Sequence, residues 1–251
     1  MSRFCLATGR HRAPPGTGAL AWAQLMRLVL PVACPGCGLP DEPLCRPCLL
    51  ALPRAAFLVP DLVATGAPPA WAAGDYASVV QRVLLAFKDD GRHDLLPVLA
   101  ASLERSARRA LRDLGWAGDG GGRPLAVVPV PSSARAVRQR GADLTAALAR
   151  GTATRLRRQG VAALTVPALR QRRGVRDQAG LSVSERADNL TGGLRLRRGC
   201  DVSDLDVLVV DDIVTTGATL TAASATLGSA GACVLGAAVV AATPRHHPAT
   251  R

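Results

Sequence analysis

The sequence predicts an α/β fold in which a parallel-sheet domain follows a small cysteine-rich region. The apolar run at residues 207–210 is typical of a buried parallel strand, and the small-residue stretch at 217–230 is typical of the helix that follows it. Four of the seven cysteines form two Cys-x-x-Cys pairs near the amino end. A chain of 251 residues, 48% of them hydrophobic, has enough core for one substantial domain and a small appendage.

The amino-terminal quarter of the chain divides into three parts. Residues 1–18 are rich in Arg, Pro and Gly without any periodic pattern, so we expect a disordered leader. Met26 offers an alternative start of translation. Residues 19–29 predict a short helix that leads into the cysteine pairs, which gives a region at 19–52 made of this helix and a zinc-binding site of four cysteines. A proline-punctuated linker follows at 53–69.

The remaining elements belong to a main domain at residues 70–245, with a tail at 246–251. Hydrophobic periodicity predicts strands around 72–76, 125–130, 163–168, 207–210 and 232–242, and helices over 78–88, 93–114, 131–159 and 217–230. The stretch at 170–189 is too charged for the core and is long enough to form a mobile cover.

The polar decapeptide at residues 211–220 is predicted to be the turn between a strand and a helix. In open α/β sheets such turns lie at the carboxyl ends of the strands, where ligands bind, and the free N–H groups of the helix start favour an anion. Gly217 permits a close approach of the backbone, and the threonine hydroxyls add donors. We therefore expect one phosphate to be held by Thr215, Thr216, Gly217, Ala218 and Thr219.

The two carboxylates upstream of this turn, Asp211 and Asp212, would repel a phosphate. Hydroxyl groups or a hydrated divalent cation are better partners, because hard oxygen ligands suit such ions. A ligand with a phosphate at one end and a diol at the other satisfies both halves of the segment. The alternative is a helix start with ordinary Asp and Thr caps, although capping needs one such residue and five are clustered here.

This segment resembles the signature of type I phosphoribosyltransferases, which holds the 5-phosphate and the ribose hydroxyls of phosphoribosyl pyrophosphate (PRPP). The resemblance implies a PRPP site with Mg²⁺ and a type I phosphoribosyltransferase-like fold. It implies that Asp211 and Asp212 are the catalytic residues, which hold the diol and stabilise positive charge developing on the sugar ring. The acceptor base is not identified by the sequence.

The cysteine pairs predict one tetrahedral zinc site. The ligands are Cys34, Cys37, Cys45 and Cys48, whose spacing matches known zinc sites. Four thiolates leave no open position for water, so the zinc would be structural and would hold a segment that has almost no core of its own. Disulfide pairing and a redox Cys-x-x-Cys motif are the alternatives, of which the second needs only one pair.

Taken together, residues 30–245 resemble the ComF/GntX family, in which a zinc-binding region precedes a phosphoribosyltransferase-like domain. The matching elements are the cysteine pairs, Val-Pro-Val-Pro at 128–131, Arg-Gln-Arg-Gly at 138–141, the polar stretch at 170–189, and the Asp-Asp-Ile-Val-Thr-Thr-Gly signature. The chain departs from the family after Arg-Gly, where Ala142, Asp143 and Leu144 replace the usual Phe-Asn-Gln.

This second resemblance implies further ligand contacts. Ser132 and Arg140 would face the pyrophosphate end of PRPP, where a planar guanidinium binds phosphate oxygens in a bidentate manner. The stretch at 170–189 would act as a lid that supplies arginines. A solvated helix face and an exposed basic loop are the respective alternatives.

Charge raises a different hypothesis about function. The formal net charge of +12 suits nucleic acid, but Lys88 is the only lysine, and an arginine bias of this kind also follows from GC-biased codon usage. Aromatic residues make up only 3% of the chain and give few platforms for base stacking. The resemblance still implies an alternative function, a non-catalytic accessory of competence and DNA uptake that binds a phosphorylated ligand or single-stranded DNA and contacts the competence machinery.

Targeting signals are weak in this sequence. The apolar stretch at 232–242 is too short to span a bilayer, so no membrane insertion is expected. The leader has no continuous apolar core before a small-residue cleavage site, so we expect a cytoplasmic protein. The sequence leaves a homo-oligomer open.

Overall fold

The computed structural model describes residues 32–60, 62, 66–116, 124–172 and 193–244. The predicted leader, the predicted helix at 19–29, most of the polar stretch at 170–189 and the tail lie outside the described residues. None of the helices in the described part of the chain combines the length and the apolar character that a membrane crossing needs.

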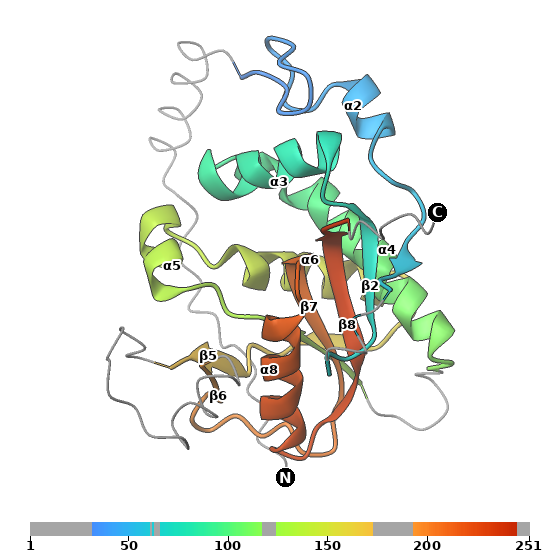
Figure 1. Ribbon diagram of the computed structural model, residues 1–251, viewed down its shortest axis with the longest axis vertical. Coiled ribbons are helices and arrows are strands. Elements are labelled where there is room, and N and C mark those ends of the chain that lie inside the picture. Colours follow the sequence, from blue (N-terminus) through green and yellow to red (C-terminus); the bar gives the residue numbers. More distant parts are fainter. Residues whose placement is uncertain (1–31, 61, 63–65, 117–123, 173–192, 245–251) are drawn as a thin grey trace, which may run out of the picture.

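A six-stranded, mostly parallel sheet forms the centre of the molecule, which confirms the predicted fold class (Figure 1). The short strand β1 pairs antiparallel with β2 at one edge and arises within the predicted linker, while all other neighbours are parallel. The strands in spatial order are β1 (Phe57–Leu58), β2 (Ala70–Asp75), β8 (Cys233–Ala242), β7 (Asp206–Val214), β3 (Leu125–Pro129) and β4 (Ala163–Thr165).

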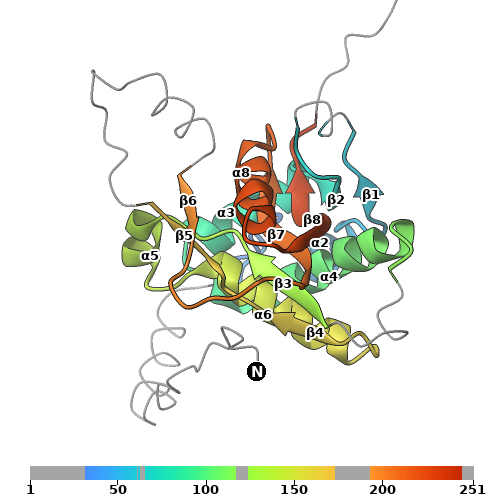
Figure 2. The ribbon, with the colours of Figure 1, turned by 90° about the horizontal axis from the view of Figure 1, so that it is seen from below.

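Helices cover both faces of this sheet (Figure 2). Successive side chains of a strand point to opposite faces, so Leu125 and Val127 of β3 join one core while Ala126 and Val128 join the other. The first core lies under α3 (Ser78–Asp89), α4 (Leu96–Asp113), which follows the 3₁₀ turn η2 (His93–Leu95), and α6 (Leu144–Arg157). The second lies under α8 (Ala218–Gly228) and the hairpin of β5 (Leu169–Gln171) and β6 (Leu194–Leu196).

The helix predicted over 131–159 is two helices, α5 (Ala134–Arg140) and α6. Gly141 ends α5 with a left-handed backbone at φ 71°, a conformation that glycine adopts without steric cost. Asp143 then begins α6, because its side chain accepts a hydrogen bond of 3.1 Å from the Ala146 N–H. These two residues therefore end one helix and begin the next, although the spacing of apolar residues predicted one continuous helix.

Strand β7 is longer than the apolar run that predicted it, and it includes both carboxylates of the signature. Asp211 pairs with Val239 of β8, and Ile213 pairs with Ala241. The prediction that the whole decapeptide is a turn was therefore wrong, because continued pairing with β8 keeps the chain extended. The turn itself consists of residues 215–217 before α8 begins.

Candidate functional site

The carboxyl ends of β3 and β7 lie side by side at the point where the chain changes direction across the sheet. The Val130 N–H donates to the Val210 carbonyl at 2.9 Å, so the two strand ends are in register. After β3 the chain crosses to the face covered by α6, whereas after β7 it crosses to the face covered by α8. Ligands of open α/β sheets bind at such a switch point, and we call these two strand ends with their following loops the switch edge.

The turn after β7 presents exposed threonines around the start of α8. Thr215, Thr216 and Thr219 are exposed, while Gly217 is buried with a left-handed backbone at φ 84°. The Ala218 N–H lies 3.4 Å from the Thr216 hydroxyl oxygen. The first N–H groups of a helix have no partners within the helix and carry its positive dipole end, so the five residues predicted to hold a phosphate lie at a helix start that attracts anions.

The acid pair at the end of β7 is electrostatically strained. Burial raises the pKa of Asp211 well above the usual aspartate range, and the neighbouring charge of Asp212 raises it further. The Asp212 N–H donates to Asp211 Oδ1 at 2.8 Å, and Asp212 Oδ1 lies 2.9 Å from Lys88 Nζ. Two adjacent carboxylates, of which only Asp212 is paired with a cation, suit a divalent cation or hydroxyl donors.

Ser132, in the loop after β3, is held by Asp143, the residue that caps the start of α6. Ser132 Oγ donates to Asp143 Oδ1 at 3.0 Å, the same oxygen that accepts from the Ala146 N–H. Asp143 is one of the three residues in which the chain departs from the ComF/GntX pattern, and its side chain has defined structural contacts. Arg140 lies farther along the chain, and its Nη2 lies 3.0 Å from Asp89 Oδ1.

The end of α3 is a component of the site that sequence reasoning missed. Lys88 contacts the acid pair of β7, and the next residue, Asp89, contacts Arg140 of α5. This helix thus joins both predicted halves of the ligand site. One signal was present in the sequence, since Lys88 is the single lysine of a chain that uses arginine for every other long cationic side chain.

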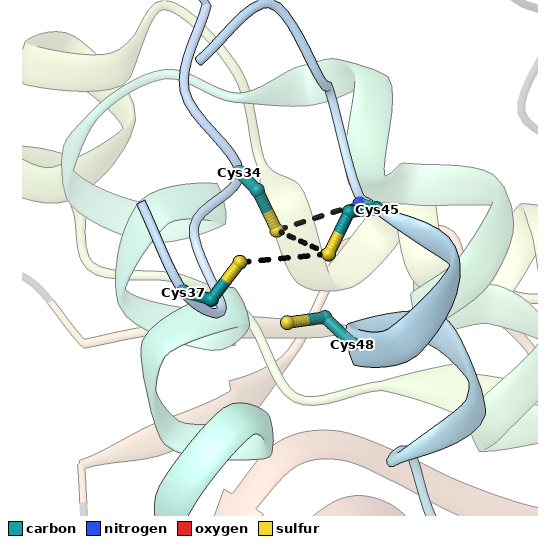
Figure 3. A group of neighbouring side chains, drawn as sticks. All are labelled: Cys34, Cys37, Cys45 and Cys48. Carbon is teal, nitrogen blue, oxygen red and sulfur yellow. Dashed lines mark hydrogen bonds between the residues drawn. The ribbon is translucent and has the colours of Figure 1, made fainter. Parts of the chain in front are cut away.

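The four predicted cysteines converge on one point (Figure 3). Their sulfur atoms all lie within 4.8 Å of one another, and Cys45 Sγ lies 3.5 Å from the sulfurs of both Cys34 and Cys37. A regular tetrahedron with Zn–S bonds of about 2.3 Å has sulfurs about 3.8 Å apart. Residues 34–48, which we call the cysteine knuckle, therefore fit a tetrahedral metal ion.

The surroundings of the cysteine knuckle favour the thiolate form of one ligand and oppose it at another. Burial raises the pKa of Cys34, but hydrogen bonds from the backbone of Cys45, Cys37 and Gly36 outweigh it and lower the pKa to about 6. Burial and the neighbouring sulfurs raise the pKa of Cys48 to about 12. A bound cation offsets such repulsion between thiolates, because metal binding and thiol deprotonation are coupled.

The cysteine knuckle rests on α3 (Figure 1). Arg82 Nε donates to the Gly36 carbonyl at 2.7 Å, and Val79 packs against the cysteine cluster. Arg92, just after α3, donates to the carbonyls of Ala33 at 2.9 Å and Pro43 at 2.7 Å. The helix that carries Lys88 to the switch edge is therefore also the platform of the knuckle.

Comparison with protein families identifies the carboxyl-terminal half of the chain. Residues 121–250, more than half of the chain, match the model of the phosphoribosyl transferase domain. This region contains β3, β7 and the loops that follow them. A search of curated proteins finds no match to the chain.

Proposed function

Because the chain belongs to the phosphoribosyl transferase domain family, we propose that it binds PRPP with Mg²⁺ at the switch edge and transfers the phosphoribosyl group to a nitrogenous base. The observation that carries this proposal is the placement of an acid pair and a threonine-rich helix start at the carboxyl end of β7, beside the end of β3. The acid pair suits the ribose diol, and the helix start suits the 5-phosphate.

The β7 side of the site binds the ribose 5-phosphate end of PRPP. The 5-phosphate accepts hydrogen bonds from the turn that runs from Thr215 to Thr219. Asp211 and Asp212 accept hydrogen bonds from the ribose hydroxyls and stabilise the positive charge that develops on the sugar ring. The raised pKa of Asp211 supports this role, because a half-buried carboxylate beside another negative charge gains stability from a cationic neighbour.

The β3 side binds the pyrophosphate end. Ser132 offers its hydroxyl and Arg140 its guanidinium to phosphate oxygens. In the structure Arg140 is paired with Asp89, and Lys88 with Asp212. PRPP binding exchanges these contacts for ligand contacts, so α3 responds to occupancy of the site.

In the transfer step a nitrogen lone pair of the base forms a bond to the anomeric carbon of the ribose, and the bond from that carbon to the pyrophosphate oxygen breaks. Pyrophosphate leaves with the electron pair. Bound Mg²⁺ would supply charge neutralisation for the pyrophosphate, and the hard carboxylate oxygens of Asp211 and Asp212 fit its coordination preference. The chain's own residues hold both ends of PRPP so that the anomeric carbon stays open to attack.

We further propose that the cysteine knuckle binds one structural Zn²⁺ and that the chain has the ComF/GntX organisation. The tetrahedral placement of four sulfurs in front of a phosphoribosyl transferase domain supports this assignment. On this proposal the zinc region ends at residue 52, a linker spans 53–69, and the phosphoribosyltransferase-like domain spans 70–245.

A turnover assay tests the proposed function. Zinc-loaded full-length protein is incubated with PRPP and Mg²⁺, and released pyrophosphate is measured with and without members of a panel of purine, pyrimidine and related nitrogen bases. Release that depends on one base establishes the enzyme and names its acceptor. Saturable PRPP binding without release in any mixture would contradict transfer and would leave a PRPP-binding protein, as the non-catalytic alternative predicts.

A further inference from the structure

A second basic site lies away from the switch edge, on the outer side of α4. Four arginines of this helix recur at intervals of three and four residues and so share one side of it. They border a pocket with a volume of about 330 Å³, which is within the range of small-molecule sites. The residues lining this arginine pocket are Arg54, Ala55, Ala56, Arg105, Arg108, Arg109 and Arg112.

Two of these arginines fix the shape of the pocket. Arg105 Nη2 donates to the Pro53 carbonyl at 3.0 Å, and Arg109 Nη1 donates to the Ala56 carbonyl at 3.3 Å. These bonds tie the segment before β1 to α4 on both sides of Arg54. The Nε of Arg105 is buried and has no hydrogen-bond partner among the described residues. The hydrogen bonds to Pro53 and Ala56 therefore preform the pocket.

Positive charge around the pocket is only partly balanced. Glu104 Oε1 lies 3.7 Å from Arg108 Nε, and Asp113 Oδ2 lies 2.8 Å from Arg109 Nε. Two carboxylates against five guanidinium groups leave three positive charges unbalanced. Among the described residues, the guanidinium groups of Arg54 and Arg112 form neither a hydrogen bond nor an ion pair.

Helix stability alone does not account for this arrangement. Cations in the last turn of a helix interact favourably with its dipole, which accounts for Arg112 alone. Arg54 belongs to another segment, and like charges three or four residues apart destabilise a helix. An anion in the pocket would relieve this repulsion.

We propose that the arginine pocket binds the oligophosphate group of a small anion, two or three phosphates in length. Guanidinium groups match phosphate oxygens in pairs, and several convergent arginines need a ligand with several negative charges. Asp113 accepts a hydrogen bond of 2.7 Å from Trp71 Nε1, near the amino end of β2. The pocket is thus separate from the acid pair, which lies at the carboxyl end of β7. Free oligophosphates and nucleoside di- or triphosphates share this chemistry.

Arginine labelling locates the ligand directly. The full-length protein is treated with phenylglyoxal, with and without millimolar tripolyphosphate or ATP, and the labelled arginines are identified by peptide mass mapping. We expect the labelling rates of Arg54, Arg108 and Arg112 to fall at least fivefold, while that of the exposed Arg158, just after α6, stays unchanged. Protection by both anions indicates a phosphate site, and stronger protection by ATP indicates a nucleotide. Equal rates with and without either anion would overturn the proposal, as would protection by single-stranded DNA alone.

Calorimetry with matched variants gives the second test. The Arg54→Ala/Arg112→Ala double variant removes the two arginines without internal partners, so the fold should tolerate it. We expect its affinity for tripolyphosphate at this site to fall at least tenfold, whereas Arg158→Ala retains wild-type affinity. An Asp211→Asn/Asp212→Asn variant should keep the protection of Arg54 and Arg112, which separates this site from the proposed PRPP site. Unchanged affinity in the Arg54→Ala/Arg112→Ala variant would contradict the proposal.

Discussion

The cysteine knuckle and the switch edge both gather electron-rich side chains, but they do so in opposite ways. In the knuckle, Cys34, Cys45 and Cys48 are 1%, 3% and 6% exposed while Cys37 is exposed, and all four ligands come from one short segment. At the switch edge the carboxylates are half-buried beside exposed threonines, and the groups come from β7, α8, the β3 loop and α3. A compact and mostly buried cluster from one segment suits a permanent metal ion, whereas an open site assembled from distant elements suits a ligand that enters and leaves.

The two regions meet on α3, whose first half supports the knuckle and whose last turn contacts the acid pair. Because both regions contact α3, substitutions in each region and at their junction can be compared. Changes in the knuckle should alter metal content first, and changes at the switch edge should alter ligand affinity first. Changes at the junction should affect both more weakly.

The largest expected effect is loss of metal from Cys45→Ser. Cys45 is the sulfur nearest to two others, and structural zinc sites of this kind supply roughly 10–16 kcal/mol to their local fold. We expect metal content, measured by mass spectrometry after dialysis, to fall from one zinc per chain to none. Cys233→Ser, at an exposed cysteine outside the cluster, should keep one zinc. Full zinc content in the Cys45→Ser protein would show that the knuckle is not the metal site.

The next effect concerns the turn at the switch edge. Valine at position 217 would have to adopt φ 84°, a left-handed conformation that costs a β-branched residue about 1–3 kcal/mol. We expect Gly217→Val to lower the affinity for PRPP by at least tenfold in calorimetric titration. Gly228→Ala lies at the other end of α8, where an added Cβ would meet open space; it is the control and should bind normally. Equal PRPP affinities of the two variants would show that this turn does not hold the phosphate.

A smaller effect is expected at the junction of the two regions. Arg92 holds the knuckle through the carbonyls of Ala33 and Pro43, and a bidentate pair with Asp94 orients its guanidinium. Arg92→Ala removes charged hydrogen bonds worth about 1.5–3 kcal/mol. Zinc transfer to a chromogenic chelator should become several-fold faster, with Arg92→Lys intermediate because it lacks the fork of donors. A wild-type transfer rate in Arg92→Ala would indicate that the knuckle is stable without this junction.

The smallest effect is a stabilisation. Because the pKa of Asp211 is raised in the folded protein, the protonated side chain contributes stability that is present at low pH and is lost as the pH rises through the folded pKa. In ligand-free protein at neutral pH, Asp211→Asn should therefore raise Tm by a few degrees. Asp212→Asn should not, because it loses the contact with Lys88. The Tm gain should shrink toward pH 4, and a gain that does not depend on pH would contradict this origin.

Much of the fold and of both sites follows from local sequence patterns. The cysteine spacing, the apolar run of β7 and the turn around Gly217 are each encoded within a few neighbouring residues, and their positions were predicted. The extension of β7 was not, since aspartates have low strand propensity and only pairing with β8 keeps Asp211 extended. The roles of Lys88 and Asp89 depend on how α3 packs across the sheet, which no local pattern reports.

We claim that the acid pair of β7 forms part of a PRPP site, and calorimetric titration of PRPP with Mg²⁺ decides whether it does. Wild-type protein and the Asp211→Asn/Asp212→Asn variant are compared, with circular dichroism and zinc content confirming that both are folded. We predict saturable binding by the wild type and no measurable binding by the double variant. Wild-type affinity in the folded double variant would contradict the claim, because the diol and metal contacts assigned to the acid pair would then be absent.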